Sequence, residues 1–339
     1  MIDNVRSLED AVAAHIGGAT RDAWVRGELS REDLLAALGA ELARADLRAA
    51  SATSRSVSPG AEALFMVPHP VLDHGSVTLV GYMGTDEDVV NAARTSYQGG
   101  TKRNSSTRDL IRYLVRHRHT TPLEMCEIQL LVRLPLFVAA QWVRHRTAVI
   151  NAESSRYSVV ENEFYLPSAE QLRAQSSANK QGRGDELPPD VQQRILEQMA
   201  EDATTAYDHY RQRLSAGLTR ELAARGLSQC LYTTWVWKCD LHNLMHFLRL
   251  RLDEHAQWEI RQYAETIAQI VRQWVPLCHE AFVDYRLEAR EFSRGEVWLI
   301  GQVLADRGVR VSELEAAGLS PREVAEFFKK FDFHIEEKR

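Results

Sequence analysis

A stretch typical of a strand runs directly into one typical of a helix, and this constrains the fold of the chain most. Across residues 127–134, every second position from Ile128 onward is apolar and most of the positions between are polar. This period of two is typical of a half-buried strand. Residues 136–140 are all apolar and lead into Gln141 without Gly or Pro, which predicts a helix directly after the strand.

Other parts of the first half give similar patterns. Residues 77–82 predict a strand, and residues 85–94 predict a helix that opens with a capping box. A second helix is expected from Ser106 or Thr107 to about His117.

The second half is predicted to be mainly helical. Residues 189–283 have a helical pattern, which includes a long amphipathic helix over residues 241–275. Residues 168–190 are rich in Gln, Ser, Asn, Gly and Pro and predict a surface excursion or an ordered loop at a subunit contact. Residues 311–331 predict two helices broken at residues 318–321.

The ends of the chain differ from its centre. Residues 1 to about 50 are Ala/Leu-rich and helical in pattern, with Ser30 as a candidate N-cap, and a Ser/Pro/Gly-rich linker follows. We therefore divide the chain into a helical N-terminal extension with its linker (1–60), a central domain (61–290) and a helical C-terminal extension (291–339).

Length and charge limit the class of protein. With 339 residues and 45% hydrophobic content, the chain can hold one large domain with appendages or two domains. A net charge of −6 argues against binding to nucleic-acid polymers, which needs a broad basic surface. No apolar run approaches the ~20 residues that span a bilayer, and the N-terminus lacks the apolar core of a signal peptide. We therefore expect a cytoplasmic protein without a membrane segment.

Several common kinds of site have little support in the sequence. The four cysteines show no C-x-x-C pairing and are expected to be reduced core residues. No dinucleotide-binding glycine pattern or P-loop occurs, which disfavours a Rossmann dehydrogenase or a kinase. His242 and His246 have metal-ligand spacing, but no third ligand is evident, so we expect no metal.

Residues 141–157 concentrate the candidate chemistry, with three arginines, a glutamine and two serines. We expect Gln141, Arg144 and His145 to share a helix face, and residues 151–156 to form a loop after it. Arginine forks and serine hydroxyls suit phosphate oxygens and planar carbonyl groups, which predicts a planar, phosphorylated ligand. Each arginine taken alone could instead be a salt-bridge partner on a solvated face. Ser154 has no Asp–His pair in the local sequence to make it a nucleophile.

Arg144, His145 and Arg146, followed after seven residues by Ser154, resemble the signature of the flavin-dependent thymidylate synthases. Segments outside the signature resemble the family too, and the resemblance covers roughly residues 71–290. It implies an α+β fold, with a mixed sheet flanked by long helices, and places the catalytic domain at residues 61–290.

The resemblance also implies roles for individual residues. The nucleotide would be bound by Gln141, Arg144, Ser154, Ser155, Arg156, Arg225 and Arg251. Flavin would be contacted by Ser96, His119, Thr121, Glu124, Arg144, His145, Arg146, Asp240, His242, His246 and His255. Arg251 would act in catalysis, because a cation against the uracil favours ionisation of N3 and makes C5 electron-rich. The run from His117 to His119 could instead be a solvated helix end.

The activity implied by the resemblance is C5 methylation of a uridine 5′-monophosphate. Methylenetetrahydrofolate would donate the carbon, and FAD reduced by NADPH would supply the hydride. A homotetramer with shared active sites is implied, in which residues 96–124 reach another subunit's signature loop.

Three departures from the family pattern bear on the substrate. Val149 stands where the family usually has Ser, Ala152 stands where it has Glu, and Arg225 is one position away from a phosphate-binding arginine. We therefore hypothesise that UMP is accepted as well as dUMP, as in the UMP/dUMP methylases of polyoxin-type antibiotic pathways. The alternatives are a thymidylate synthase that acts on dUMP only and a homologue that binds nucleotide and FAD without catalysis.

Overall fold

The computed structural model describes residues 55–96, 105–177 and 182–331. The chain divides between Val57 and Ser58, and the sheet and its helices belong to the second unit. The helices predicted for residues 1–50, including the one with Ser30 as N-cap, lie outside the described residues.

The end of the predicted linker is already part of the fold. Ser58 is buried and caps α4 (Pro59–Leu64), because its hydroxyl accepts a hydrogen bond from the Ala61 backbone N–H. The same hydroxyl donates to the Trp274 carbonyl oxygen at 2.7 Å. Ser58 therefore ties the start of the second unit to a helix more than two hundred residues away.

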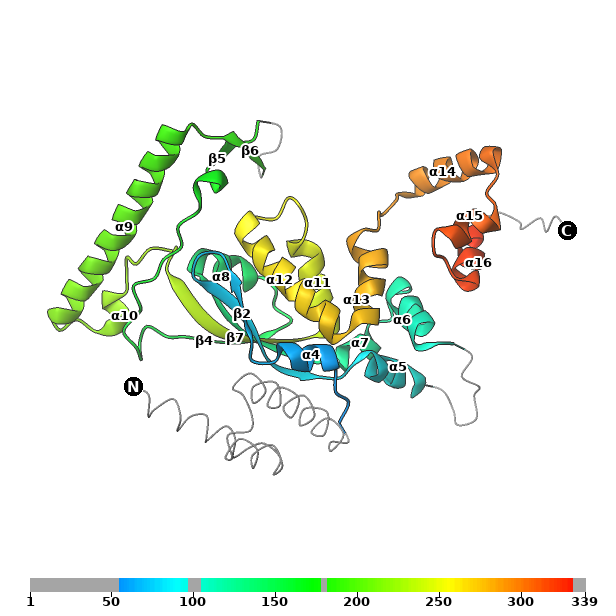
Figure 1. Cartoon of the computed structure of the whole chain (residues 1–339), viewed down its shortest axis with the longest axis horizontal. Helices are drawn as coiled ribbons and strands as arrows, with labels where there is room; N and C mark the ends of the chain where they lie inside the picture. The colour runs from blue at the N-terminus through cyan, green and yellow to red at the C-terminus, as the bar shows by residue number, and fades with distance from the viewer. Residues whose placement is uncertain (1–54, 97–104, 178–181, 332–339) are drawn as a thin grey trace, which may run out of the picture. The chain divides into compact units, whose positions relative to one another are not determined.

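A five-stranded sheet with the order β1-β2-β3-β7-β4 forms the centre of the second unit (Figure 1). Its strands are β1 (Pro68–Val71), β2 (Gly75–Met83), β3 (Glu127–Pro135), β7 (Tyr232–Asp240) and β4 (Val149–Ala152). The α+β class is confirmed. The expectation of a mixed sheet is wrong for the strands that the structure describes, because β7 lies between β3 and β4 and runs antiparallel to both, and the other neighbouring pairs are also antiparallel.

Three helices, α8 (Leu136–Trp142), α11 (Leu241–Arg251) and α12 (Trp258–Trp274), pack against the sheet (Figure 1). Trp142 on α8 is fully buried where the three helices pack against the sheet. Its ring lies 5.4 Å from that of Trp237 on β7, 4.7 Å from Phe247 on α11 and 6.0 Å from Tyr263 on α12. Packed aromatic rings of this kind bury a large apolar area, so the end of α8 is held firmly.

The elements predicted for residues 77–134 are confirmed. The predicted strands are β2 and β3, and in β3 the alternating positions Ile128, Leu130, Val132 and Leu134 are buried while Gln129 and Leu131 are exposed. The capping-box helix is α5 (Asp86–Arg94), where the Thr85 backbone N–H donates to the Asp88 carboxylate at 2.8 Å. Ser106 caps α6 (Thr107–Arg116), which ends one residue before the predicted His117.

The predicted helical region over residues 189–283 is wrong in two places. It contains β7, whose Trp235, Trp237 and Cys239 form the buried side of a strand. The long helix predicted over residues 241–275 is two helices, because α11 ends at Arg251 and α12 begins at Trp258. The Asp253 carboxylate accepts a hydrogen bond from the His255 backbone N–H at 2.8 Å, and this local turn replaces the next helical turn.

The outer elements surround this core. The predicted excursion contains the antiparallel pair β5 (Arg173–Gln175) and β6 (Arg183–Glu186), and α9 (Pro189–Ser215) and α10 (Arg220–Ala223) follow. The chain then returns through α13 (Pro276–Phe282) and the short η2 (Val283–Leu287). The two helices predicted near the C-terminus are α15 (Val311–Ala316) and α16 (Pro321–Lys330), whereas α14 (Arg294–Arg307) was not predicted.

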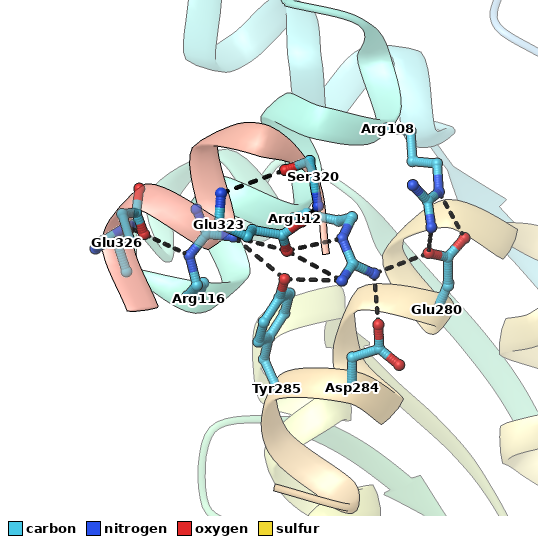
Figure 2. A network of polar contacts seen from close by, with 10 residues as sticks. Arg108, Arg112, Arg116, Glu280, Asp284, Tyr285, Ser320, Glu323 and Glu326 are labelled. Carbon is cyan, nitrogen blue, oxygen red and sulfur yellow. Dashed lines mark hydrogen bonds and ion pairs between the residues drawn. The ribbon is translucent and has the colours of Figure 1, made fainter. Parts of the chain in front are cut away.

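A buried ionic network joins α16 to the central domain (Figure 2). Arg112 on α6 is only 6% exposed and pairs with Glu280 at 2.9 Å, Asp284 at 2.5 Å and Glu323 at 3.0 Å. Arg116, one turn later, pairs with the same Glu323 carboxylate at 3.0 Å. The C-terminal helix is therefore anchored on α6 by charges that are largely shielded from water.

Candidate active site

Residues of α11 contribute to the walls of two hollows. The larger one, here called the Arg251 hollow, has a volume of about 990 Å³ and is lined by Gln141, Arg251, His255 and Gln257 among others. The smaller one, here called the His246 cavity, has a volume of about 220 Å³ and is lined by His119, His242 and His246 among others.

Arg251 is the last residue of α11 and is half-buried. Its Nε donates to His145 Nε2 at 2.9 Å, and its terminal nitrogen donates to the Gln141 carbonyl oxygen at 3.3 Å. Burial lowers the pKa of the guanidinium, and no carboxylate among the described residues forms an ion pair with it. The site therefore holds a cation whose charge is left for a ligand.

His145 is neutral in this arrangement, because its Nε2 accepts the hydrogen bond from Arg251. Burial, then the charge of Arg251, then His246 lower the pKa of its imidazole to about 4. The ring packs 4.9 Å from Phe247 and 6.3 Å from the His246 ring. His145 thus lies between the two hollows.

The signature arginines lie on a turn and not on the helix. α8 ends at Trp142 with Val143 as its C-cap, so the prediction that Gln141, Arg144 and His145 share a helix face is wrong. The buried Trp142 ends the helix against the core and turns the chain outward. Arg144 and Arg146 are exposed, and neither forms an ion pair with any residue that the structure describes.

The other predicted nucleotide ligands lie away from both hollows within a single chain. Ser154 and Ser155 follow β4, and the Ser154 hydroxyl accepts a hydrogen bond from the Arg156 backbone N–H at 3.3 Å. The Arg156 side chain pairs with Glu221 of α10 at 2.9 Å. Arg225 is exposed and does not line either hollow.

The predicted flavin ligands are partly brought together. His119, His242 and His246 line one cavity, and His119 stacks on Tyr113 with ring centroids 5.6 Å apart. The other members of the set do not line this cavity. Ser96, Thr121 and Glu124 are exposed, and the Asp240 carboxylate caps α11 by accepting a hydrogen bond from the Asn243 backbone N–H. His255 lines the Arg251 hollow.

His255 does not share a helix with Arg251, contrary to the sequence prediction. It lies in the turn between α11 and α12, where its ring contacts the Asp253 carboxylate at 2.9 Å. The cause is the hydrogen bond from the His255 backbone N–H to the Asp253 carboxylate, which turns the chain after the end of α11.

Arginines that sequence analysis did not single out also line the His246 cavity. Arg118, Arg249 and Arg286 stand at its edge together with Glu291, while Leu123 and other apolar residues form its inner wall. A signal for Arg118 was present in the basic run of residues 117–119, but the other two arginines are distant in sequence.

Comparison with known proteins identifies the family. Residues 78–277 match the family model described as thymidylate synthase complementing protein. A flavin-dependent thymidylate synthase from Ruegeria pomeroyi is 50% identical over 279 residues, which cover 81% of this chain and 91% of that protein. One from Wolbachia pipientis is 46% identical over 281 residues, covering 83% of this chain and 98% of that protein. This chain belongs to the flavin-dependent thymidylate synthase family.

A solved structure resembles this flavin-dependent thymidylate synthase family member as well. It is the UMP/dUMP methylase PolB from Streptomyces cacaoi bound with 5-Br UMP, which is 34% identical with a TM-score of 0.59 over 64% of this chain and 99% of that chain. A second structure of the same methylase, bound with 5-Br dUMP, is 33% identical with the same TM-score over 65% of this chain and 99% of that chain. The family predicted from the signature is confirmed.

The residues of the His246 cavity fit the flavin that the family requires. An apolar wall suits a flat heterocycle, imidazoles can hydrogen-bond its polar edge, and guanidinium groups at the rim suit the phosphate of a flavin nucleotide. Among the described residues, no helix is both long and apolar enough to cross a membrane, and no three His, Cys, Asp or Glu side chains are placed to share a metal ion.

Proposed function

We propose that this enzyme methylates C5 of a uridine 5′-monophosphate, with Arg251 activating the uracil. The observation that carries the proposal is the half-buried Arg251 guanidinium, which is oriented by His145 and Gln141 and has no carboxylate partner among the described residues. A cation held in this way stabilises the anion formed when N3 of uracil loses its proton. That ionisation raises the electron density at C5.

The protonation of the buried cysteines also agrees with activation of the uracil by charge. Burial raises the pKa of the Cys126 thiol to about 12, and it raises the pKa values of Cys239 and Cys278 as well. Thiols with such pKa values are not nucleophiles at neutral pH, because the thiolate is the reactive form. Cys230 lines neither hollow. The chain therefore offers electrostatic activation in place of a covalent bond to the protein.

The reaction needs a one-carbon donor and a source of two electrons, and we propose the co-substrates that the family resemblance implies. Methylenetetrahydrofolate would donate the one-carbon unit, and NADPH would provide the electrons. Bound FAD, once reduced, supplies the hydride that completes the methyl group. The side chains of this chain position the nucleotide at Arg251 and Gln141, while the neutral His145 holds the guanidinium in place.

We also propose that the working form is a homotetramer with shared sites. Arg144, Arg146, Ser154 and Ser155 do not line the Arg251 hollow of their own chain, and the first two are exposed without an ion-pair partner among the described residues. These features support a site completed by a neighbouring subunit, with the exposed Ser96, Thr121 and Glu124 reaching another chain's signature.

The sugar preference is proposed to include ribose. Val149 is 69% exposed and Ala152 is also exposed on β4, so neither is required by the core. A glutamate at position 152 would add a carboxylate to this strand, and its absence leaves space beside a ribose 2′-hydroxyl. PolB is named as a methylase of both UMP and dUMP, that is, of a ribonucleotide and a deoxyribonucleotide.

A direct comparison of substrates tests this proposal. Purified enzyme, FAD, NADPH and methylenetetrahydrofolate are incubated anaerobically with UMP or dUMP, and the C5-methyl product is measured by mass spectrometry. Product from both nucleotides is the expected result. Product from dUMP alone would contradict acceptance of UMP, and product from neither, with nucleotide binding retained, would favour a binding-only homologue.

The Ala152→Glu variant sharpens the comparison. We expect turnover of UMP to fall more than turnover of dUMP, because the added carboxylate would be placed against the ribose hydroxyl. Val149→Ser serves as a matched change on the same strand. Equal losses for the two nucleotides in Ala152→Glu would contradict the assignment of sugar preference to this position.

A further inference from the structure

The rim of the His246 cavity carries more positive charge than its own carboxylate can balance. Arg118, Arg249 and Arg286 stand there, and Glu291 is the one carboxylate among the described residues that line the cavity. Glu291 lies 3.3 Å from Arg118 and 3.6 Å from Arg249. Burial lowers the pKa of Arg286, and the nearby charges of Arg118 and Arg249 lower it further. Arg286 therefore lies near both of the other arginines, and Glu291 offsets part of their effect on it.

Arg118 is held in an unusual backbone conformation. Its φ is 59°, in the left-handed region that residues other than glycine rarely adopt. This is the left-handed residue that commonly follows a helix end: the His119 backbone N–H donates to the Leu114 carbonyl oxygen at 2.9 Å and closes the end of α6. Arg118 and His119, on either side of this reversal, both line the cavity.

Figure 2 shows the contacts that hold α6, the helix that ends two residues before Arg118. Arg112 and Arg116 fix α6 to Glu323 of α16, and both guanidinium groups also contact the Tyr285 hydroxyl, at 2.8 and 3.2 Å. From the other side, Arg286 donates to the Val115 carbonyl oxygen at 2.5 Å. The last turn of α6 is thus fastened on two sides, which fixes the position from which Arg118 extends.

The Glu291 carboxylate lies within ion-pair distance of both Arg118 and Arg249. Its side chain is 73% exposed and that of Arg118 is 69% exposed, so the two can separate at little cost. Arginine forks pair with carboxylates and with phosphates alike, so the same two arginines suit a phosphate group. A ligand phosphate would carry more charge than Glu291 and would displace it.

We infer that Arg118 and Arg249, with Arg286 behind them, form a phosphate subsite for the flavin nucleotide, which Glu291 occupies when the ligand is absent. This inference rests on the proposed function, because it assumes that the flavin ring binds in the His246 cavity. The rim selects the phosphate-bearing forms of the cofactor, FAD and FMN, over riboflavin. Glu291 acts as an internal competitor that weakens binding until the nucleotide arrives.

Binding of three flavins to flavin-free protein tests the inference. FAD, FMN and riboflavin share the ring but differ in phosphate, and their dissociation constants are measured by fluorescence titration. Arg249→Ala and Arg118→Asn should weaken FAD and FMN binding by about 10- to 100-fold and leave riboflavin binding unchanged. Asn is chosen at position 118 because it tolerates a positive φ.

Glu291→Gln gives a change of opposite sign. Removal of the competing carboxylate should tighten FAD and FMN binding by roughly twofold to fivefold without affecting riboflavin. Matched controls are Arg272→Ala and Glu288→Gln, exposed residues that do not line the cavity and should leave all three constants unchanged.

Any one of four results would overturn the inference. Equal losses for riboflavin and FAD in the arginine variants would mean that the arginines shape the cavity and do not bind phosphate, and weaker FAD binding in Glu291→Gln would mean that Glu291 organises the rim. If wild-type protein binds riboflavin and FAD but the arginine variants bind FAD normally, the subsite alone fails. If wild-type protein binds no flavin, the proposed function fails with it.

Discussion

At the scale of single residues, the contact between Arg251 and His145 determines what the site can do. An imidazole that accepts a hydrogen bond from a guanidinium must stay unprotonated, and burial favours the same neutral form. The pair therefore keeps one positive charge at a defined place across the physiological pH range, which is what activation of uracil at N3 needs.

This pair predicts a specific titration. His145 should titrate near pH 4 in two-dimensional NMR spectra, against an ordinary pKa of 6.5. In Arg251→Met the midpoint should rise but stay below 6.5, because burial is the larger cause. Since the unfolded chain takes up a proton at His145 first, its contribution to stability is complete above pH 6.5 and declines as the pH falls toward 4. An unchanged midpoint in Arg251→Met, with Arg272→Met as the control, would contradict the coupling.

Activity should depend on the guanidinium group itself and not only on its charge. Arg251→Lys keeps the charge but cannot donate to both His145 and Gln141 in the same fork geometry. We expect kcat/KM to fall by about 10²- to 10³-fold, the range found when one electrostatic stabiliser is lost. A lysine variant with nearly normal turnover, measured by product formation, would show that orientation at this position is unimportant.

The residues of this contact and those of the neighbouring cavity differ in how clearly the sequence singled them out. Gln141 and Arg251 were named as nucleotide ligands and His145 as a flavin ligand from the family resemblance; the structure brings the three together, and their roles stay predictions. Arg249 and Glu291 gave no signal, since a single arginine or glutamate on a helix or loop resembles any solvated charge. Their relation depends on a contact across 42 positions that no local pattern contains.

At the scale of secondary-structure elements, local periodicity succeeded where an element is amphipathic along its whole length. β3 alternates at all but one position and was predicted, whereas the helical prediction over residues 189–283 was wrong for β7, which lies between helices on both sides. The break after α11 was missed for a different reason. The apolar stripe continues into α12, while a single side-chain hydrogen bond at Asp253 turns the chain.

The anchor between α6 and α16 gives a prediction about stability. Glu323→Ala should lower the free energy of unfolding by about 3 kcal/mol, because it leaves Arg112 and Arg116 buried without one partner. Arg112 keeps Glu280 and Asp284, which places the loss at the lower end of the range for buried pairs. Urea denaturation followed by circular dichroism measures the change.

The control for this prediction is the exposed ion pair of the same extension. Glu313 contacts Arg307 at 3.4 Å and Arg310 at 3.3 Å, and both arginines are largely exposed. Glu313→Ala should change the free energy of unfolding far less than Glu323→Ala does, because its ion pairs are exposed to water. Similar losses in Glu323→Ala and Glu313→Ala would contradict the structural role assigned to burial.

At the scale of the whole molecule, the proposed tetramer predicts complementation between inactive variants. If a site takes Thr121 from one subunit and Arg251 from another, then mixing Arg251→Ala with Thr121→Ala protein should restore part of the activity. Some sites would then contain neither substitution. The mixture is unfolded and refolded together, and its turnover is compared with that of each variant refolded alone. Turnover no higher than the mean of the separate variants would contradict shared sites.

The release of tritium from C5-labelled nucleotide tests the central claim most directly. The enzyme is assayed anaerobically with reduced FAD and methylenetetrahydrofolate, and tritium in water is measured together with C5-methyl product. The account predicts release in step with product for wild-type protein and its loss in Arg251→Ala. Tritium release and product at the wild-type rate in Arg251→Ala, or no release by wild-type protein with bound flavin and nucleotide, would contradict it.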